Sequence, residues 1–246
     1  TCICGYFTYQ KLELFRTQRY STLIQYRYSK AMKQIAIVDY GLGNLFSVKQ
    51  ALEFCCEGKD KNVVITSSPS IIKESDYLVL PGVGAFENAM HAILSKDLKD
   101  PITNFASSGK PLLGICLGMQ ILGTSSEEFG QHQGLNLISG KVSFIGDTNL
   151  DGSLRKVPSI GWKNLNVKPN INTSNNALAA YEALSVYFVH SFHFVPENAG
   201  HLIASYDYGD TKISAAVQKD NIIGYQFHPE KSGQNGLKIL ESFLNM

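Results

Sequence analysis

The sequence has no long apolar run and no excess of charge of either sign. A helix needs roughly 20 apolar residues to cross a bilayer, and no segment of the 246-residue chain approaches that length. The 22 Lys and Arg residues nearly balance the 21 Asp and Glu residues, which leaves a formal net charge of +1. We therefore expect no membrane and no nucleic acid among its partners, because neither an apolar span nor a basic excess is present.

Cysteine is scarce, and its spacing is irregular. An odd number of cysteines without framework spacing argues against a disulfide scaffold, and there is no pair of CxxC motifs to form a zinc site. The five cysteines are Cys2, Cys4, Cys55, Cys56 and Cys116. We expect a reduced, cytoplasmic protein that needs no metal and no organic cofactor.

Residues 1–31 differ in composition from the rest of the chain. They contain five Lys or Arg residues and one Glu, and they lack the compact apolar core of a secretory signal. A transit peptide is one interpretation, but Met32 directly precedes an apolar segment typical of a buried strand. We therefore expect residues 1–31 to be an extension outside the fold. Residues 33–246 have no Pro-, Gly- or Ser-rich linker, which indicates one domain.

From Met32 onward, short β-type apolar runs alternate with segments of helical spacing. Residues 34–40 and 62–66 are typical of buried strands, for example, and residues 45–56 between them have helical spacing. This alternation predicts an α/β fold with an open, twisted, mostly parallel sheet flanked by helices, as in flavodoxin-like proteins. The second half predicts additional antiparallel strands with short turns. Two of them are residues 185–192 and 222–227.

The segment PLLGICLGMQIL places a cysteine between two glycines where a predicted strand meets a predicted helix. In such a G-x-Nuc-x-G elbow the central residue is strained and exposed at the carboxyl end of the sheet. The flanking Gly114 and Gly118 remove Cβ atoms that would collide there. The start of the helix over residues 117–122 favours the thiolate and directs the Leu117 N–H towards an oxyanion. Cys116 is therefore a candidate nucleophile, although two glycines around a cysteine can also reflect close packing.

A thiolate nucleophile needs a base, and the base needs an orienting group. The segment QFHPEKS places His228 at the end of a predicted strand, two residues before Glu230. Alternate residues of an extended segment share a side, so Glu230 can accept a hydrogen bond from the ring nitrogen that faces away from Cys116. The competing interpretation is a histidine that only caps the strand end.

The segment LPGVGAF forms a glycine loop after another predicted strand. It has neither the G-x-G-x-x-G pattern nor the lysine of a phosphate-binding loop. Gly82 and Gly84 instead allow backbone N–H groups to approach a substrate carbonyl. All three segments follow the carboxyl ends of strands, where open α/β sheets place their sites.

Together, P-G-x-G, G-x-C-x-G and Q-F-H-P-E resemble the class I (triad) glutamine amidotransferases. A longer series of motifs is similar, in order, to the glutaminase subunits of imidazole glycerol phosphate synthases: DYGLGN, LPGVGAF, GICLGMQIL, SSEEFG, VPSIGW, YFVHSF and QFHPEKS. The resemblance covers residues 33–246. It implies hydrolysis of L-glutamine and transfer of the ammonia to a barrel-type cyclase subunit in a heterodimer.

The resemblance also implies roles for individual residues. Cys116, His228 and Glu230 would form the triad. Val83, Gly84 and Leu117 would supply oxyanion N–H groups, and Gln120, Ser191 and Phe192 would hold the glutamine. Asn44, Trp162 and Lys231 would lie at or near the face where the partner docks.

Two positions depart from the family pattern. Ser159 stands where the family commonly has histidine, and His193 stands where tyrosine is usual. By resemblance, both lie near the partner face. They point to a second hypothesis, a paralogous subunit that feeds ammonia to the amidation of a surface-glycan or flagellin sugar. A stand-alone Cys–His hydrolase and a degenerate binding subunit are further hypotheses, although the intact triad argues against the degenerate subunit.

Overall fold

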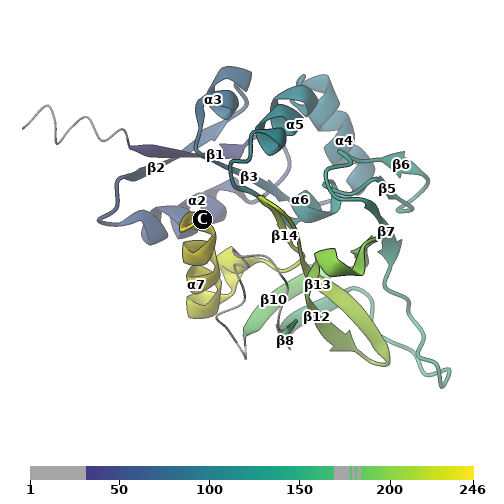
Figure 1. The fold of residues 1–246 in the computed structure, drawn as a ribbon. Coiled ribbons are helices and arrows are strands. Elements are labelled where there is room, and N and C mark those ends of the chain that lie inside the picture. Colours follow the sequence, from purple (N-terminus) through teal and green to yellow (C-terminus); the bar gives the residue numbers. More distant parts are fainter. Residues whose placement is uncertain (1–31, 169–177, 179–180, 182–183) are drawn as a thin grey trace, which may run out of the picture.

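The computed structural model describes residues 32–168, 178, 181 and 184–246 (Figure 1). The predicted extension, residues 1–31, lies outside the described residues. The largest element is an eight-stranded sheet in the order β2-β1-β3-β4-β14-β13-β12-β9. Its strands are β2 (Lys61–Thr66), β1 (Lys33–Val38), β3 (Tyr77–Gly82), β4 (Leu112–Cys116), β14 (Ile222–Tyr225), β13 (Thr211–Lys219), β12 (Leu202–Tyr208) and β9 (Asn166–Val167).

The pairing between neighbouring strands changes once across this sheet, from parallel to antiparallel. Neighbours from β2 to β14 are parallel, and those from β14 to β9 are antiparallel. The parallel part contains the first four strands of the chain, as the alternating sequence pattern predicts. The antiparallel part comes from the second half, where short turns replace crossover helices. The predicted α/β class is confirmed.

Helices cover both faces of the sheet. On β1, Ile35 and Ile37 pack in one apolar cluster, while Ala36 and Val38 pack in the other, because successive side chains point to opposite faces. The first cluster contains buried residues of α2 (Leu45–Cys56) and α7 (Gly233–Leu244). The second contains those of α3 (Pro69–Glu74), α4 (Phe86–Ser95) and α5 (Lys99–Ser107). Figure 1 shows these two helix groups on either side of the sheet.

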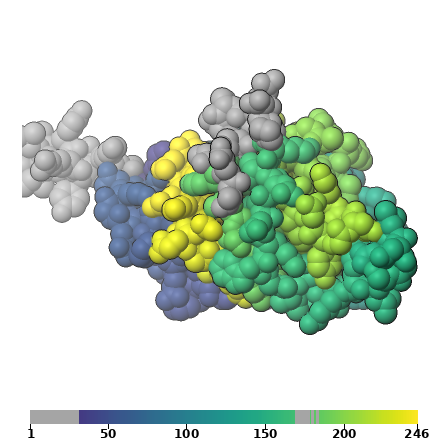
Figure 2. Space-filling view, turned by 90° about the horizontal axis from the view of Figure 1, so that it is seen from below, coloured from purple at the N-terminus to yellow at the C-terminus, as the bar shows by residue number. Residues whose placement is uncertain are grey.

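The C-terminal helix α7 packs between the first segment of the chain and its second half. In Figure 2 the yellow C-terminal residues lie between the purple-to-blue first segment and the green second half. The side chains of Ile239, Leu240 and Phe243 are fully buried in the cluster that includes α2. None of the helices in the described part of the chain is long and apolar enough to span a bilayer.

Two smaller sheets flank the antiparallel part. One pairs β10 (Ser185–His190) with β8 (Ser159–Asn164), and the other has the order β11-β7-β5-β6. The strands of this four-stranded sheet are β11 (Phe192–Pro196), β7 (Gly140–Phe144), β5 (Ser125–Ser126) and β6 (His132–Gln133). The short helices are α6 (Leu117–Gln120), η1 (Ala199–His201) and η2 (Pro229–Lys231).

The prediction of one strand over residues 185–192 was wrong. The chain leaves the β10–β8 sheet after His190 and enters the β11–β7 ladder at Phe192, with Ser191 between them. The apolar pattern continues across the break, so the sequence did not indicate it. The change of sheet turns the Ser191 region towards the cavity described below.

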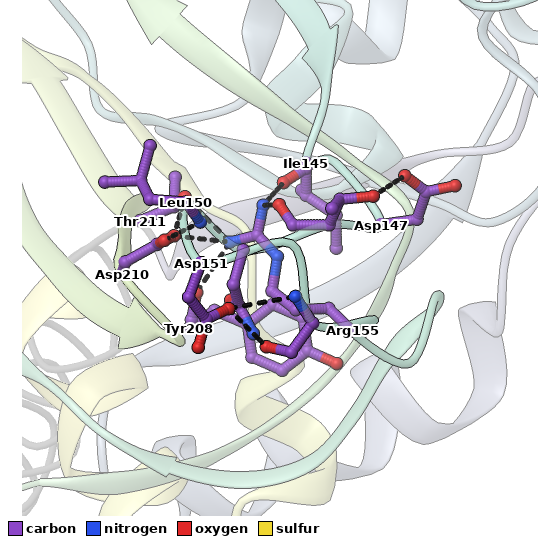
Figure 3. Close-up of polar contacts among 11 residues, drawn as sticks. Ile145, Asp147, Leu150, Asp151, Arg155, Tyr208, Asp210 and Thr211 are labelled. Atoms are coloured by element: carbon purple, nitrogen blue, oxygen red, sulfur yellow. Dashed lines mark hydrogen bonds and ion pairs between the residues drawn. The ribbon is translucent and has the colours of Figure 1, made fainter.

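Arg155 holds the segment between β7 and β8 in place through hydrogen bonds to neighbouring strands (Figure 3). Its Nη1 donates to the Tyr208 carbonyl at 2.8 Å and to the Thr211 hydroxyl at 2.7 Å, and its Nη2 donates to the Ile145 carbonyl at 3.2 Å. Nη1 also lies 3.5 Å from Oδ1 of Asp210, and the arginine side chain is only 8% exposed. One guanidinium therefore ties this segment to the turn between β12 and β13.

Candidate active site

Cys116 is the last residue of β4, and its backbone is strained. Its φ is 55° and its ψ is −111°, a conformation that residues with a Cβ rarely adopt. This geometry agrees with the nucleophile elbow predicted from the sequence. The predicted helix over residues 117–122 is shorter than expected, since α6 spans only Leu117–Gln120. A four-residue helix has a smaller dipole than the longer helix that the sequence predicted.

The two glycines of the elbow are required by close backbone contacts. A Cβ on Gly118 would lie 1.7 Å from the carbonyl oxygen of Leu80 in β3, and a Cβ on Gly114 would lie 2.5 Å from the carbonyl oxygen of Gly118. No side chain fits at such separations. The glycines let the turn after β4 sit directly against β3, which carries the glycine loop.

The parallel register brings the three predicted segments together. On one side of β4, Gly82 of β3 pairs with Cys116. On the other side, Tyr225 of β14 pairs with Ile115, so the chain after β14 continues beside the nucleophile. Segments that are far apart in the sequence therefore meet at one sheet edge, as the carboxyl ends of parallel strands do.

His228 and Glu230 form a buried pair. Nδ1 of His228 lies 2.8 Å from Oε1 of Glu230, and their side chains are only 3% and 2% exposed. The predicted route to this contact was wrong, because Pro229–Lys231 form the 3-10 helix η2 rather than an extended segment. His228 caps that helix, and the tight turn brings the carboxylate within hydrogen-bond distance of Nδ1. The predicted contact is nonetheless present.

The environment of His228 suits a proton carrier. Burial lowers the pKa of its imidazole, but the Cys116 thiol and the Glu230 carboxylate outweigh burial and raise it to about 10. Nε2 is buried without a hydrogen-bond partner among the described residues. Cys116 and His228 line the same cavity. Nε2 is therefore the ring nitrogen left to exchange a proton with the sulfur or with a substrate.

The cavity beside Cys116 has a volume of about 320 Å³. It brings together all the residues to which the resemblance gave oxyanion and substrate roles. Its lining includes Val83, Gly84, Leu117, Gln120, Ser191 and Phe192. It also includes His190, which flanks Ser191 in the sequence and was expected to shape a pocket. Three further lining residues had no predicted cavity role: Glu128, Pro158 and Val189.

Glu128 is the acidic side chain of this lining. Its Oε2 accepts the backbone N–H of Phe86 at 2.7 Å, which fixes the carboxylate at the cavity. A fixed anion there can pair with the ammonium group of an amino-acid ligand. The only signal for it in the sequence is the pair of acids in SSEEFG, which alone does not distinguish a ligand from a surface charge.

Tyr40 is hydrogen-bonded to the start of the glycine loop. Its hydroxyl donates to the Pro81 carbonyl at 2.5 Å, and burial together with the nearby Cys116 raises the pKa of this phenol. Gly84 has a φ of +107°, and a Cβ added there would meet nothing within 4 Å. The first residues of the loop are thus held, while the Gly84 end has room to change its peptide orientation.

His190 and His193 are both buried and neutral. Nε2 of His190 lies 2.8 Å from the Tyr206 hydroxyl, which is hydrogen-bonded at 3.0 Å to the hydroxyl of Ser159. Burial lowers the pKa of His190 to about 3 and that of His193 to about 4. Ser159 is fully buried and His193 is 9% exposed. Both side chains are therefore largely enclosed by the protein, and their position near the partner face stays a prediction.

The three residues assigned to the partner face are exposed, and two of them adjoin His228. Trp162, 54% exposed, packs edge-on against Tyr187, whose carbonyl accepts the His228 N–H at 2.9 Å. Lys231 is exposed, and its N–H donates to the His228 carbonyl at 3.0 Å. Asn44 is exposed as the N-cap of α2, where its side chain accepts the Ser47 N–H.

The described residues contain no cluster of three or more His, Cys, Asp or Glu side chains arranged to hold a metal ion. The groups around the cavity are a thiol, an imidazole–carboxylate pair and backbone N–H groups. This combination is suited to acyl transfer, in which a nucleophile, a proton carrier and an oxyanion site act on one carbonyl.

Comparison with known sequences identifies similar proteins. The family model "Glutamine amidotransferase class-I" matches residues 36–246. The chain is 45% identical over 222 residues to "Imidazole glycerol phosphate synthase subunit HisH 1" of Legionella pneumophila (strain Paris), covering 87% of this chain and 100% of the relative. It is 44% identical over 216 residues to the HisH subunit of Methanosarcina acetivorans, with the same coverage of both chains.

Solved structures show the same fold at lower identity. The chain in "Structure of PurLQS from Thermotoga maritima" aligns with a TM-score of 0.62 and 22% identity, covering 87% of this chain and 98% of that one. The glutaminase domain of Trypanosoma brucei CTPS with bound acivicin aligns with a TM-score of 0.57 and 17% identity, covering 87% and 94%. At these identities the likeness concerns the fold alone.

Proposed function

The chain belongs to the class-I glutamine amidotransferases, and we propose that it is the glutaminase subunit of an imidazole glycerol phosphate synthase in histidine biosynthesis. In this role it hydrolyses L-glutamine to glutamate and ammonia and passes the ammonia to a cyclase subunit. The observation that carries the proposal is one cavity lined by Cys116, His228 and the glycine loop, with Glu230 hydrogen-bonded behind the imidazole.

The first half-reaction forms a thioester. The Cys116 sulfur attacks the side-chain carbonyl carbon of glutamine, and the oxyanion is stabilised by the N–H groups of Leu117 and of the loop at Val83 and Gly84. As the first residue of α6, Leu117 has no partner for its N–H within that helix. The C–N bond breaks as the imidazolium of His228 gives its proton to the departing ammonia.

The second half-reaction releases glutamate. The now neutral His228 takes a proton from water, and the resulting hydroxide attacks the thioester carbon. The C–S bond breaks, glutamate leaves, and the sulfur and the imidazolium return to their starting state. Glu230 holds the imidazole in one orientation throughout, and its negative charge favours the imidazolium form.

The cavity offers complementary groups to the amino-acid end of glutamine. The Glu128 carboxylate can pair with the α-ammonium group. Gln120 uses its Nε2 for hydrogen bonds within the protein, so its Oε1 is left as an acceptor for a substrate N–H. Ser191 and Phe192 also line the cavity and are available to contact the substrate.

The partner in this proposal is a barrel-type cyclase that forms a heterodimer with the chain, and we expect the complex in the cytoplasm. The names of the relatives support this pairing, because each is a subunit of imidazole glycerol phosphate synthase. Trp162, Lys231 and Asn44 are exposed and available for docking. Burial of Ser159 and His193 weakens the case for a sugar-amidating paralogue, because neither residue can select a different partner by contact.

The test compares glutamine turnover by the purified chain alone and with a barrel-type cyclase and its acceptor. Ammonia released into neutral water is protonated and lost, so we expect the lone chain to be slow. Reorienting one oxyanion peptide in the glycine loop changes the rate by roughly 100- to 1,000-fold, which sets the expected activation. Equal rates for the chain and the complex would instead support the stand-alone hydrolase.

A further inference from the structure

Gln226 lies beside the nucleophile but outside the cavity. It directly follows β14, is fully buried, and its backbone N–H donates to the Ala215 carbonyl at 2.9 Å. Its side-chain Nε2 lies 3.7 Å from the Cys116 sulfur, within the range of an N–H···S hydrogen bond. The pairing of Tyr225 with Ile115 explains the contact, since the next residue on each strand is Gln226 and Cys116.

A second glutamine determines which way the Gln226 amide faces. Nε2 of Gln120 donates to Oε1 of Gln226 at 3.1 Å and also to the carbonyl oxygen of Phe192 at 2.9 Å. Both protons of this amide are therefore used. If the Gln226 amide were turned over, two NH₂ groups would face each other, so its oxygen must face Gln120 and its N–H must face the sulfur.

We propose that Gln226 stabilises the Cys116 thiolate by direct N–H donation, and that Gln120 is the positioning residue that orients the Gln226 amide. The inference rests on the proposed role of Cys116 as the nucleophile. Hydrogen bonds to a charged partner are roughly twice as strong as neutral ones, so this contact favours the thiolate over the thiol. It compensates for the short α6, whose four residues provide little dipole.

Other titratable groups also face the sulfur, and the test must leave them in place. His228, backed by Glu230, and the phenol of Tyr40 interact with Cys116. Glu128 and His190 line the same cavity. None of these five residues is altered in the variants below. In Gln226→Met, which adds no charge, a changed response can therefore be traced to the lost amide.

The experiment measures the rate of Cys116 alkylation by iodoacetamide against pH, with the modified peptide quantified by mass spectrometry. This readout resolves Cys116 from the other four cysteines and requires neither glutamine nor a partner. In Gln226→Met, which has no donor, we expect the pH of half-maximal rate to rise by about one unit. In Gln226→Glu, which keeps an acceptor for Gln120 but adds an anion beside the sulfur, we expect a larger rise.

Gln218→Met is the matched control. Gln218 is also buried, at 2% exposure, and lies on the adjacent strand β13, where its Nε2 donates to the Asp220 carbonyl. The same substitution there should leave the alkylation profile unchanged. If both Gln226 variants keep the profile of the parent, or if Gln218→Met shifts it equally, the inference is wrong.

Gln120→Glu tests the orienting role. A carboxylate at position 120 should turn the Gln226 amide so that its NH₂ faces the carboxylate and its oxygen faces the sulfur. We expect the alkylation midpoint to rise as in Gln226→Met, and an unchanged midpoint would overturn the orienting role. A parent protein whose Cys116 fails to react at any pH would contradict the proposed nucleophile itself, so the two failures are distinguishable.

Discussion

The imidazole of His228 and the carboxylate of Glu230 are joined across a single proline, with Nδ1 and Oε1 2.8 Å apart. Pro229 is the first residue of the 3-10 helix η2, and this tight turn brings the glutamate to the Nδ1 edge of the ring. Because both side chains are almost completely buried, solvent screens the attraction between them only weakly. Protonation of His228 is consequently linked to folding.

This pair predicts a pH-dependent contribution to stability. Burial lowers the pKa of His228, but Cys116 and Glu230 outweigh burial and together raise this pKa in the folded protein to about 10, above its ordinary value of 6.5. The stabilisation is therefore complete below about pH 6.5 and is lost as the pH rises to about 10. Glu230→Gln should lower the unfolding free energy by about 1–3 kcal/mol near pH 6, with a smaller difference towards pH 10. Urea denaturation at several pH values measures this, and a difference that grows with pH would contradict it.

Cys116→Ser should abolish glutamine hydrolysis while leaving the fold intact. The hydroxyl is similar in size to the thiol, but it does not ionise near neutral pH. Glutamine turnover measures the loss, and circular dichroism checks the fold. With the cyclase present, free ammonium at high pH should restore synthesis of its product. Retained glutamine-dependent turnover would show that another residue is the nucleophile.

Gly118→Ala should destabilise the protein by about 3 kcal/mol or more, because a buried overlap with a backbone carbonyl cannot relax through a rotamer change. The added Cβ would meet the Leu80 oxygen in β3 at 1.7 Å. Gly152→Ala is the control, since its φ is +83° but its Cβ would have no neighbour within 4 Å. That change should cost only about 1–2 kcal/mol of backbone strain. Thermal unfolding compares the stability of the two variants. Equal losses of stability would show that the overlap with the Leu80 carbonyl is not the cause.

Arg155→Lys should destabilise the segment between β7 and β8. An ammonium group cannot reproduce the planar set of donors that the guanidinium directs at Tyr208, Thr211 and Ile145. We expect a loss of about 1–3 kcal/mol in urea denaturation, because buried carbonyls lose their donors. Asp210→Asn should have a smaller effect, since that carboxylate is more exposed. A larger loss of stability in Asp210→Asn than in Arg155→Lys would show that the ion pair contributes more than the hydrogen bonds to the carbonyls.

Removal of residues 1–31 should change neither glutamine turnover nor the melting temperature. The first strand begins at Lys33, and the family match begins at residue 36. Comparing the truncated and full chains tests this expectation. A large loss of activity or stability on truncation would show that the extension has a role in the fold.

The sequence by itself determined the features that depend on local geometry. Alternation of β and α patterns predicted the parallel half of the sheet, because side-chain periodicity is a property of each segment alone. The glycines around Cys116 predicted the strained elbow, because a tight turn at that position has no room for Cβ atoms on either side. The segments that carry the triad were found because each is a short motif of a few consecutive residues.

Only the tertiary structure decided the contacts that depend on strand order and register. Gln226 and Cys116 are 110 residues apart, and they meet because β14 pairs with β4 in one register. Glu128 reaches the cavity by accepting the N–H of Phe86, 42 residues away. The Ser191 break and the burial of His193 depend on which sheet each strand joins. Such pairings are selected by packing of the whole core, so no short stretch of sequence contains them.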